Sequence, residues 1–174
     1  FDAVVLAVHS DQALALLADP SPAERDILGA MRYQANDTVL HTDTALLPRA
    51  PLARAAWNYH VLRDRQELAA LTYDMNILQS LPAGRPLLVT LNRTAAIDPA
   101  KILKRMTYHH PIYTPAAIAA QQRRGEISGV RRTYYCGAYW RYGFHEDGVA
   151  SAEWAVADLE AKKGSDLFFG AVAC

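Results

Sequence analysis

The chain has 174 residues, of which 51% are hydrophobic, so it is long enough to form a domain with a sizeable core. Its 18 basic and 18 acidic side chains give a formal net charge of zero, which argues against binding to nucleic acid or to anionic lipid. No apolar run approaches the roughly 20 residues of a membrane span. These properties predict a soluble globular protein.

The two cysteines, Cys136 and Cys174, are far apart in the sequence. Such a pair does not form a disulfide framework and is compatible with the reducing cytoplasm, where we expect the protein to be located. The sequence shows no signal peptide.

The first thirty residues are predicted to form one strand followed by two helices. Residues 2–8 form a hydrophobic strand, and Ser10 or Asp11 can cap a helix that extends to Leu17. A second helix is predicted to begin after Ser21, because this serine is followed by proline at the first helical position and by glutamate in the first turn.

From Asn36 onward the pattern changes to short β-rich runs separated by Pro, Gly, Asp and Asn. Several strands in succession without a helix between them favour an antiparallel meander. Another helix is predicted over residues 116–124, ending at Gly125. The predicted strands cover residues 38–42, 55–59, 68–73 and 87–91.

The C-terminal region predicts a short buried strand over residues 133–139, a glycine-punctuated aromatic loop to Gly148, and a helix from Val149 to about Lys162. A helix that opens at a loop directs unpaired backbone N–H groups and the positive end of its dipole into that loop. An electron-rich ring or a phosphate would be stabilised there.

These features resemble the C-terminal portion of flavin-containing amine oxidase-like proteins, and more narrowly a bacterial group of predicted NAD/FAD-binding oxidoreductases. The resemblance extends from Phe1 to about Leu159. It is carried by the segments Asp2-Ala-Val-Val-Leu-Ala7, Val39-Leu-His-Thr-Asp43, Ala56-Trp-Asn-Tyr59, Thr72-Tyr-Asp-Met-Asn76, Leu88-Val-Thr-Leu-Asn92, His110-Pro-Ile-Tyr-Thr-Pro115 and Tyr135-Cys-Gly-Ala138 with Tyr142-Gly-Phe-His-Glu-Asp-Gly148.

The resemblance implies an α+β fold, with an antiparallel sheet flanked by helices and terminal pieces of a parallel FAD-binding layer. Residues 1–8 and 133–174 would belong to the FAD-binding domain, and residues 9–132 would form a substrate-binding-type domain. The Gly-x-Gly-x-x-Gly phosphate loop of such proteins does not occur in the sequence. We therefore expect a fragment of a longer polypeptide, whose partner is the missing N-terminal FAD-binding region.

The same resemblance places FAD in the full-length protein, with no FAD expected on this fragment alone, which could pair as a homodimer. Ala138 departs from the broader pattern, because many relatives have an acidic residue there to hold the ribityl or pyrophosphate region. The backbone N–H groups of Gly148 and Val149 would face the pyrimidine edge of the flavin. The implied cofactor-binding residues are Gly137, Tyr142, Gly143, Phe144, Gly148 and Val149.

The function implied is that of an FAD-dependent oxidoreductase, which oxidises a C–N or C–C bond of a small-molecule substrate by hydride transfer to flavin. The fragment alone would be inactive. The alternative is a cofactor-free binding or scaffold domain that has kept the architecture. Strand positions indicate four substrate-lining residues: Trp57, Tyr59, Tyr73 and Tyr113.

Other interpretations of the junction remain open. The aromatic residues over 134–144 can be ordinary packing residues, and Asp147-Gly148 can be a simple N-cap. His145-Glu-Asp147 has metal-ligand chemistry, but no second cluster has diagnostic spacing, and the adjacent His109 and His110 would point to opposite faces of a strand. We therefore predict no metal site.

The remaining candidates for chemistry are weaker. The histidines at positions 9, 41 and 60 are interpreted as structural residues at strand ends or edges. No serine lies in a Gly-x-Ser-x-Gly elbow, and Cys136 is predicted to lie within a buried strand. A hydrolytic nucleophile is therefore not predicted.

Overall fold

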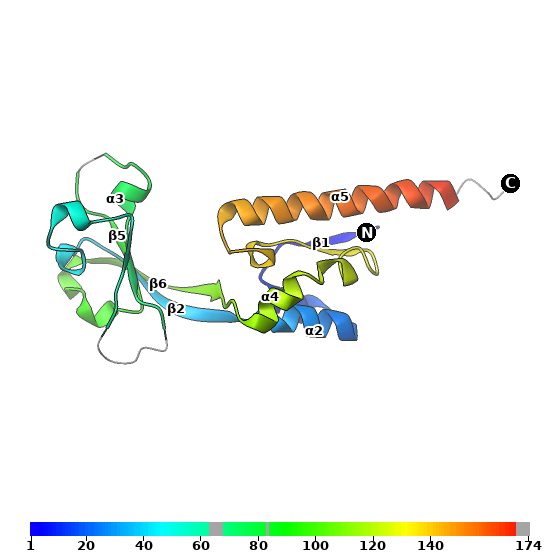
Figure 1. The fold of residues 1–174 in the computed structure, drawn as a ribbon, viewed down its shortest axis with the longest axis horizontal. Helices are drawn as coiled ribbons and strands as arrows, with labels where there is room; N and C mark the ends of the chain where they lie inside the picture. The colour runs from blue at the N-terminus through cyan, green and yellow to red at the C-terminus, as the bar shows by residue number, and fades with distance from the viewer. Residues whose placement is uncertain (63–67, 83, 170–174) are drawn as a thin grey trace. The chain divides into compact units, whose positions relative to one another are not determined.

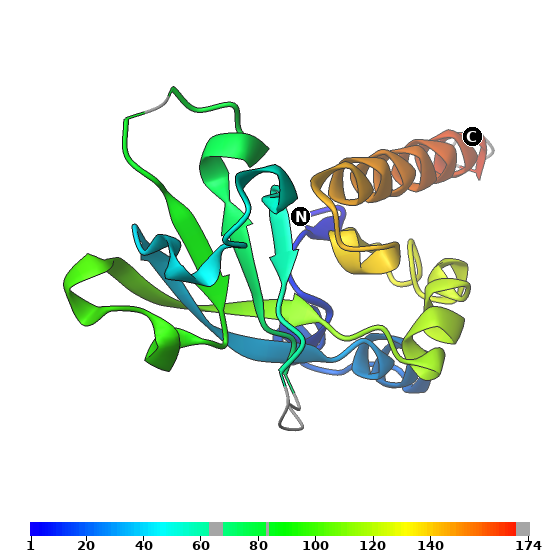
Figure 2. The ribbon, with the colours of Figure 1, turned by 60° about the vertical axis from the view of Figure 1, so that its left-hand side comes forward.

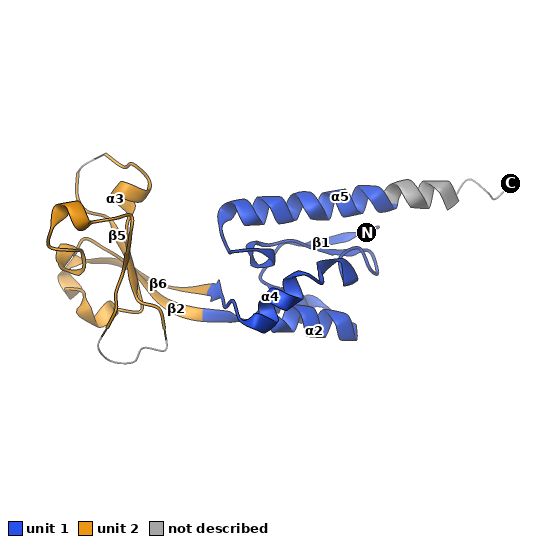
Figure 3. Ribbon diagram, viewed as in Figure 1, with its two compact units in different colours: residues 1–34, 110–174 blue, residues 35–109 orange. Residues whose placement is uncertain are grey.

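A computed structural model of the chain describes residues 1–62, 68–82 and 84–169, with side chains up to residue 162. The chain divides into two compact units (Figure 3). Unit 1 contains residues 1–34 and the chain from residue 110 onward, and unit 2 contains residues 35–109. The chain leaves unit 1 through strand β2 (Tyr33–His41) and returns to it through strand β6 (Ile102–Pro111).

Unit 1 is built around two short parallel strands, β1 (Val4–Leu6) and β7 (Thr133–Tyr135), with Val4 opposite Thr133 and Leu6 opposite Tyr135. Its helices are α1 (Ser10–Leu16), α2 (Pro22–Ala30), α4 (Pro115–Gln121) and α5 (His145–Phe169), and its 3₁₀ turns are η5 (Arg124–Glu126) and η6 (Ala138–Trp140). Helix α5 lies on one side of β1, and α2 and α4 lie on the other (Figure 1).

The side chains of β7 explain why helices cover both faces of this sheet. Tyr135 packs in a cluster with residues of α1, α2 and α4, including Ile27. Its neighbours Tyr134 and Cys136 point the opposite way and pack with Ala155 of α5. Every one of these side chains is nearly fully buried, so the strand is apolar on both faces, as parallel strands usually are.

Helix α2 begins as the sequence predicts. The Ser21 hydroxyl accepts from the Glu24 N–H at 3.2 Å, and the Glu24 carboxylate accepts from the Ser21 N–H at 2.7 Å. The Tyr135 hydroxyl donates to the same buried carboxylate at 2.6 Å, which ties the helix to β7. Burial opposes ionisation of Glu24, but these hydrogen bonds outweigh it and hold the pKa of the carboxyl below its usual value.

Unit 2 is a five-stranded antiparallel sheet with the strand order β3-β4-β5-β2-β6 (Figure 2). Its other strands are β3 (Trp57–Tyr59), β4 (Leu71–Asp74) and β5 (Leu88–Leu91). The connections contain helix α3 (Met75–Leu78) and the 3₁₀ turns η1 (Thr44–Leu46), η2 (Pro51–Ala53), η3 (Thr94–Ala96) and η4 (Pro99–Lys101). Val39 packs with Leu46 and Ile97, so the turns cover one face of the sheet.

The structure confirms a mixed α/β chain with an antiparallel sheet and a small parallel one. The four predicted strands of the sheet are present, and β3, β4 and β5 form a meander. Strand β6 was not predicted, and β2 lies between β5 and β6 rather than beside β3. Within the described residues, no helix is both long and apolar enough to cross a membrane.

The boundaries of the units differ from the expected domain limits at residues 8 and 132. The chain changes units at residues 34 and 109, because α1, α2 and α4 pack on the parallel strands of unit 1. The antiparallel sheet, which we expected to be flanked by these helices, is accompanied in its own unit by 3₁₀ turns and the short α3.

Candidate functional site

The junction between β7 and α5 is the first candidate site, and its helix begins earlier than the sequence suggested. Helix α5 starts at His145 instead of Val149, because the Gly148 N–H already donates to the Phe144 carbonyl at 3.2 Å. The Asp147 N–H donates to the same oxygen at 3.0 Å. The backbone N–H groups of His145 and Glu146 have no acceptor among the described residues, so they are the free donors of the first turn.

Asp147 holds the loop that leads into α5. Its Oδ2 accepts from the Tyr142 N–H at 3.1 Å and from the Phe144 N–H at 3.0 Å, and Arg141 Nε lies 3.4 Å from Oδ1. Asp147 is 5% exposed, so this carboxylate is buried and stabilises the loop through these hydrogen bonds. Its position before Gly148 suggested an N-cap, whereas it is an acidic residue of the first turn that reaches back to the residue before the helix.

Two glycines of the junction make room for aromatic rings. A side chain at Gly137 would overlap the Tyr139 ring, which is buried in the core of unit 1. Gly143 has φ +89°, and a Cβ there would lie 2.6 Å from the Tyr113 hydroxyl. The structure therefore places Tyr113, predicted to line the substrate, against Gly143, predicted to contact the cofactor. Burial, and then the negative charge of Asp147, raise the pKa of Tyr113 to about 12.

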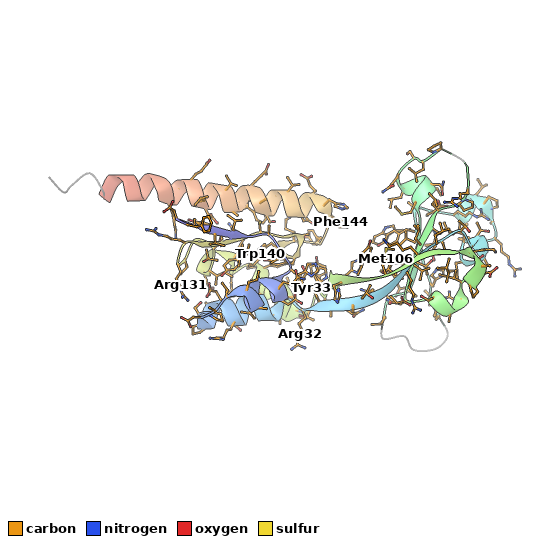
Figure 4. All side chains as sticks on the ribbon, turned by 180° about the vertical axis from the view of Figure 1, so that it is seen from behind. Arg32, Tyr33, Met106, Arg131, Trp140 and Phe144 are labelled. Carbon is orange, nitrogen blue, oxygen red and sulfur yellow. The ribbon has the colours of Figure 1, made fainter. Side chains whose placement is uncertain are left out.

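The remaining predicted cofactor-contacting side chains are accessible in unit 1. Tyr142 is 70% exposed, Phe144 60% and Val149 53%. Phe144 lies at the N-terminal end of α5 (Figure 4). By contrast, Trp140 and Tyr139 are buried, and neither the Trp140 Nε1 nor the Tyr139 hydroxyl has a hydrogen-bond partner within the described part of the chain.

The donor set of this junction fits the edge of a flavin ring. Two free backbone N–H groups at the positive end of a long helix favour an anionic or electron-rich edge, and exposed aromatic side chains can pack against a planar ring. The sequence has no Gly-x-Gly-x-x-Gly motif for the pyrophosphate of a dinucleotide. The junction therefore offers contacts for one part of such a cofactor.

The second candidate site is one face of the sheet in unit 2, where three predicted substrate-lining residues come together. Trp57 lies opposite Tyr73, Tyr73 opposite Val89, and Val89 opposite Leu40. Tyr59 lies on the same face, two residues after Trp57. We call these five residues, Leu40, Trp57, Tyr59, Tyr73 and Val89, the aromatic face.

The aromatic face is partly open. Trp57 is 57% exposed and Tyr59 66% exposed, while Leu40, Tyr73 and Val89 are half-buried. The Trp57 and Tyr73 rings meet edge to face, with centroids 5.4 Å apart and planes at 84°. Tyr113, the fourth predicted lining residue, belongs to unit 1.

The opposite face of the same sheet carries a buried chain of hydrogen bonds that the sequence analysis did not predict. The Asp43 N–H donates to His41 Nδ1 at 3.1 Å, so the neutral ring carries its proton on Nε2 and donates to Thr90 Oγ1 at 2.7 Å. Thr90 and Thr72 hydroxyls are 2.8 Å apart, and Thr72 lies 2.8 Å from His60 Nε2. These contacts join His41, Thr90, Thr72 and His60 in one continuous hydrogen-bonded chain.

Protonation of the two histidines in this hydrogen-bond chain should destabilise unit 2 in mild acid. Burial lowers the pKa of His41 against the opposing effect of the Asp43 charge, and burial together with the Arg93 charge lowers the pKa of His60. Below the histidine pKa of the unfolded chain, about 6.5, the unfolded chain therefore binds more protons than the folded protein does. The stability that the neutral histidines contribute above that pH is lost as the pH falls below it. Urea unfolding at pH 7.5 and pH 5 should show a lower free energy of unfolding at pH 5.

Two variants separate this effect from general acid sensitivity. His41→Gln should reduce the pH dependence of unfolding between these pH values, because it removes the buried titrating ring. His145→Gln changes an exposed histidine and should leave the dependence intact. An unchanged pH dependence in His41→Gln would show that the buried His41 ring is not its cause.

No three His, Cys, Asp or Glu side chains lie close enough to hold a metal ion within the residues that the structure describes. His9 stacks on Tyr33 with centroids 4.0 Å apart, and Cys136 is buried with its pKa raised by burial. Each of these groups therefore has a packing role.

No family model matches the sequence, and no curated protein matches it either. The resemblance to amine oxidase-like flavoproteins accordingly stays a prediction, and the arguments for function come from the two candidate sites.

Proposed function

We propose that this chain is part of an FAD-dependent oxidoreductase of the amine oxidase type, which oxidises a C–N or C–C bond of a small-molecule substrate. The observation that carries the proposal is the junction of β7 and α5. There, two free backbone N–H groups and the positive end of a long helix adjoin the exposed Tyr142 and Phe144. In this proposal unit 1 contacts the flavin, and the sheet of unit 2 belongs to a substrate-binding domain.

The parallel strands of unit 1 support the part of the proposal that concerns a larger FAD-binding domain. Parallel sheets are normally covered by helices on both faces and contain more than two strands. Here both faces are covered, yet the residues that the structure describes contribute only β1 and β7 to this sheet, and Val4 and Val5 of β1 are 46% and 47% exposed. Further strands from an FAD-binding region of the same polypeptide would complete such a sheet.

Bound FAD would supply the hydride acceptor, and the residues of this chain would position and polarise it. The N–H groups of His145 and Glu146 would stabilise negative charge at the ring edge. Asp147 would keep these donors in place by holding the preceding loop, and Tyr142 and Phe144 would pack against the ring. Gly148, whose N–H is already bonded, would contribute by its lack of a side chain.

A pair of Gly148 variants tests the flavin position in protein expressed from the complete reading frame that contains this chain. A Cβ at Gly148 meets only the Ala138 nitrogen at 4.0 Å, so the fold accommodates alanine there. Gly148→Val adds a branched isopropyl group at the junction, two methyl groups more than alanine, and should lower the flavin content at least about tenfold, the effect of about 1.4 kcal/mol in binding. Gly148→Ala should retain most of it.

Flavin content is measured from visible absorbance of the purified proteins, with thermal unfolding to confirm that each variant is folded. Wild-type protein without flavin, even after incubation with FAD, would refute the proposed function. Full flavin content in Gly148→Val would refute the position of the cofactor.

The alternative function is a cofactor-free binding or scaffold domain, and one observation favours it. The Tyr139 ring fills the space beside Gly137, and Tyr113 fills the space beside Gly143, so internal packing already accounts for both glycines. A folded protein from the complete reading frame that binds no flavin would support this alternative.

A further inference from the structure

A cavity of about 320 Å³ lies beside helix α3 in unit 2, and none of the residues of the aromatic face lines it. Its volume falls within the range of about 300–1,000 Å³ that small-molecule sites occupy. The walls come from α3 with its N-cap, from the connection between β2 and β3, and from the segment that leads into β5. Leucines at positions 47 and 81 line the cavity together with Arg54 and Arg85, so it combines apolar surface with two positive charges.

The wall that carries Arg85 is fastened to α3 by the side chain of Asn76. The Asn76 amide donates to the Arg85 carbonyl at 3.2 Å and accepts from the Leu87 N–H at 2.7 Å. The Met75 N–H donates to the Leu87 carbonyl at 3.0 Å. These bonds lie entirely within the protein, so this wall forms without a ligand, as is usual for small-molecule sites.

The two arginines of the cavity have donors to spare. Arg54 Nε donates to the Pro48 carbonyl at 3.1 Å, which orients the guanidinium and leaves its two terminal nitrogens available. Neither Arg54 nor Arg85 forms an ion pair with a residue that the structure describes. The planar guanidinium group presents paired N–H donors that match the oxygens of a carboxylate or a phosphate.

One carboxylate, that of Asp74, also lines the cavity. Its Oδ1 accepts from the N–H groups of Asn76 at 3.1 Å and Ile77 at 3.2 Å, and the residue is 9% exposed, so it serves as the cap of α3. The other carboxylates that the structure describes in unit 2 pair with Lys101 or Arg105, which do not line the cavity.

The connection between β3 and β4 does not alter this balance of charge at the cavity. The two strands are joined beyond Tyr59 and Leu71, at the end of β4 that lies away from Asp74. Two guanidinium groups therefore meet one carboxylate at the cavity, and the excess positive charge favours a negatively charged ligand.

We propose that this cavity binds a small organic anion, in which a carboxylate or phosphate group is joined to a short apolar body. Arg54 and Arg85 bind the anionic group, and the leucines at positions 47 and 81 contact the apolar body together with Ile77. The proposal does not rest on the proposed oxidoreductase function. Binding is measured without flavin, so either proposal can fail while the other stands.

Four probes separate the charge from the apolar body: hexanoate, hexyl phosphate, 1-hexanol and acetate. Titrations followed by saturation-transfer difference NMR at low salt should show hexanoate and hexyl phosphate binding at least about tenfold more tightly than 1-hexanol, which lacks the charge, and acetate, which lacks the body. The tighter of the two anions identifies the anionic group. Equal affinity for 1-hexanol or for acetate would overturn the proposal, as would the absence of any binding.

Three variants, each of which removes one positive charge, localise the site. Arg54→Gln and Arg85→Gln should each weaken hexanoate binding about fivefold to tenfold. Arg49→Gln changes an exposed arginine that does not line the cavity and should not weaken it. Thermal unfolding confirms that each variant is folded. Equal weakening in all three variants would show a general effect of net charge and refute the site, and so would unchanged binding in the Arg54 and Arg85 variants.

Discussion

Gly137→Ala is expected to destabilise unit 1 by about 3 kcal/mol, the largest effect that we foresee for a single added methyl group. The new Cβ would overlap the ring of Tyr139, which is 1% exposed and packed beside Trp140 in the main core of the unit. Either the ring or the strand end must move, and the Gly137 N–H would lose its 2.8 Å hydrogen bond to Ser151 if the strand end did. Urea unfolding measures the change.

Gly125→Ala is the matched control, because a Cβ at Gly125 meets nothing within 4 Å. This control should lie within about 0.5 kcal/mol of wild type. A double-mutant cycle with Tyr139→Leu identifies the cause, since truncating the ring should remove most of the cost of Gly137→Ala. Equal stabilities of the Gly137→Ala and Gly125→Ala proteins would contradict the explanation.

Thr90→Val should destabilise unit 2 by a similar amount, about 3 kcal/mol. Valine has nearly the shape of threonine, so the change removes the hydroxyl without leaving a cavity. It leaves the His41 Nε2–H without an acceptor and removes the hydroxyl that shares a hydrogen bond with Thr72, and all three residues are fully buried. Each buried polar group left unsatisfied costs about 1–3 kcal/mol.

Thr107→Val on the exposed side of β6 provides the control and should change stability by less than about 0.5 kcal/mol. The destabilisations caused by removing the two threonine hydroxyls should not be additive. Thr72→Val combined with Thr90→Val should lower the free energy of unfolding by less than the sum of the single changes. Additive costs would mean that the two threonines do not act as one chain.

Local signals in the sequence predicted the helices with clear caps and missed the start of α5. Ser21, Pro22 and Glu24 identify the beginning of α2 unambiguously. Helix α5 follows Phe144, whose side chain cannot cap a helix, and Asp147 instead reaches back from the first turn to the backbone. Because Asp147-Gly148 has the composition of a cap, the sequence placed the helix start at the wrong residue.

Strand pairing depends on contacts that are distant in the sequence and was therefore less predictable. Strand β6 lies at the edge of the sheet and is largely exposed, so its sequence has no clear apolar alternation. Trp57, Tyr59 and Tyr73 were predicted as lining residues and do share one face. The link between Thr72 and Thr90 follows only from the register of β4 against β5, which the sequence does not specify.

The insertion of unit 2 within unit 1 has a consequence for the order in which the protein folds during synthesis. Val4 pairs with Thr133, so β1, α1 and α2 emerge from the ribosome long before their partners β7, α4 and α5. At roughly 5–20 residues per second, residues 35–109 alone take about 4–15 s to synthesise. Unit 2 is continuous and can fold in that interval, while the apolar side of α2 has no β7 to cover it. The nascent chain is therefore most prone to aggregation, and most dependent on chaperones, while unit 2 is being made.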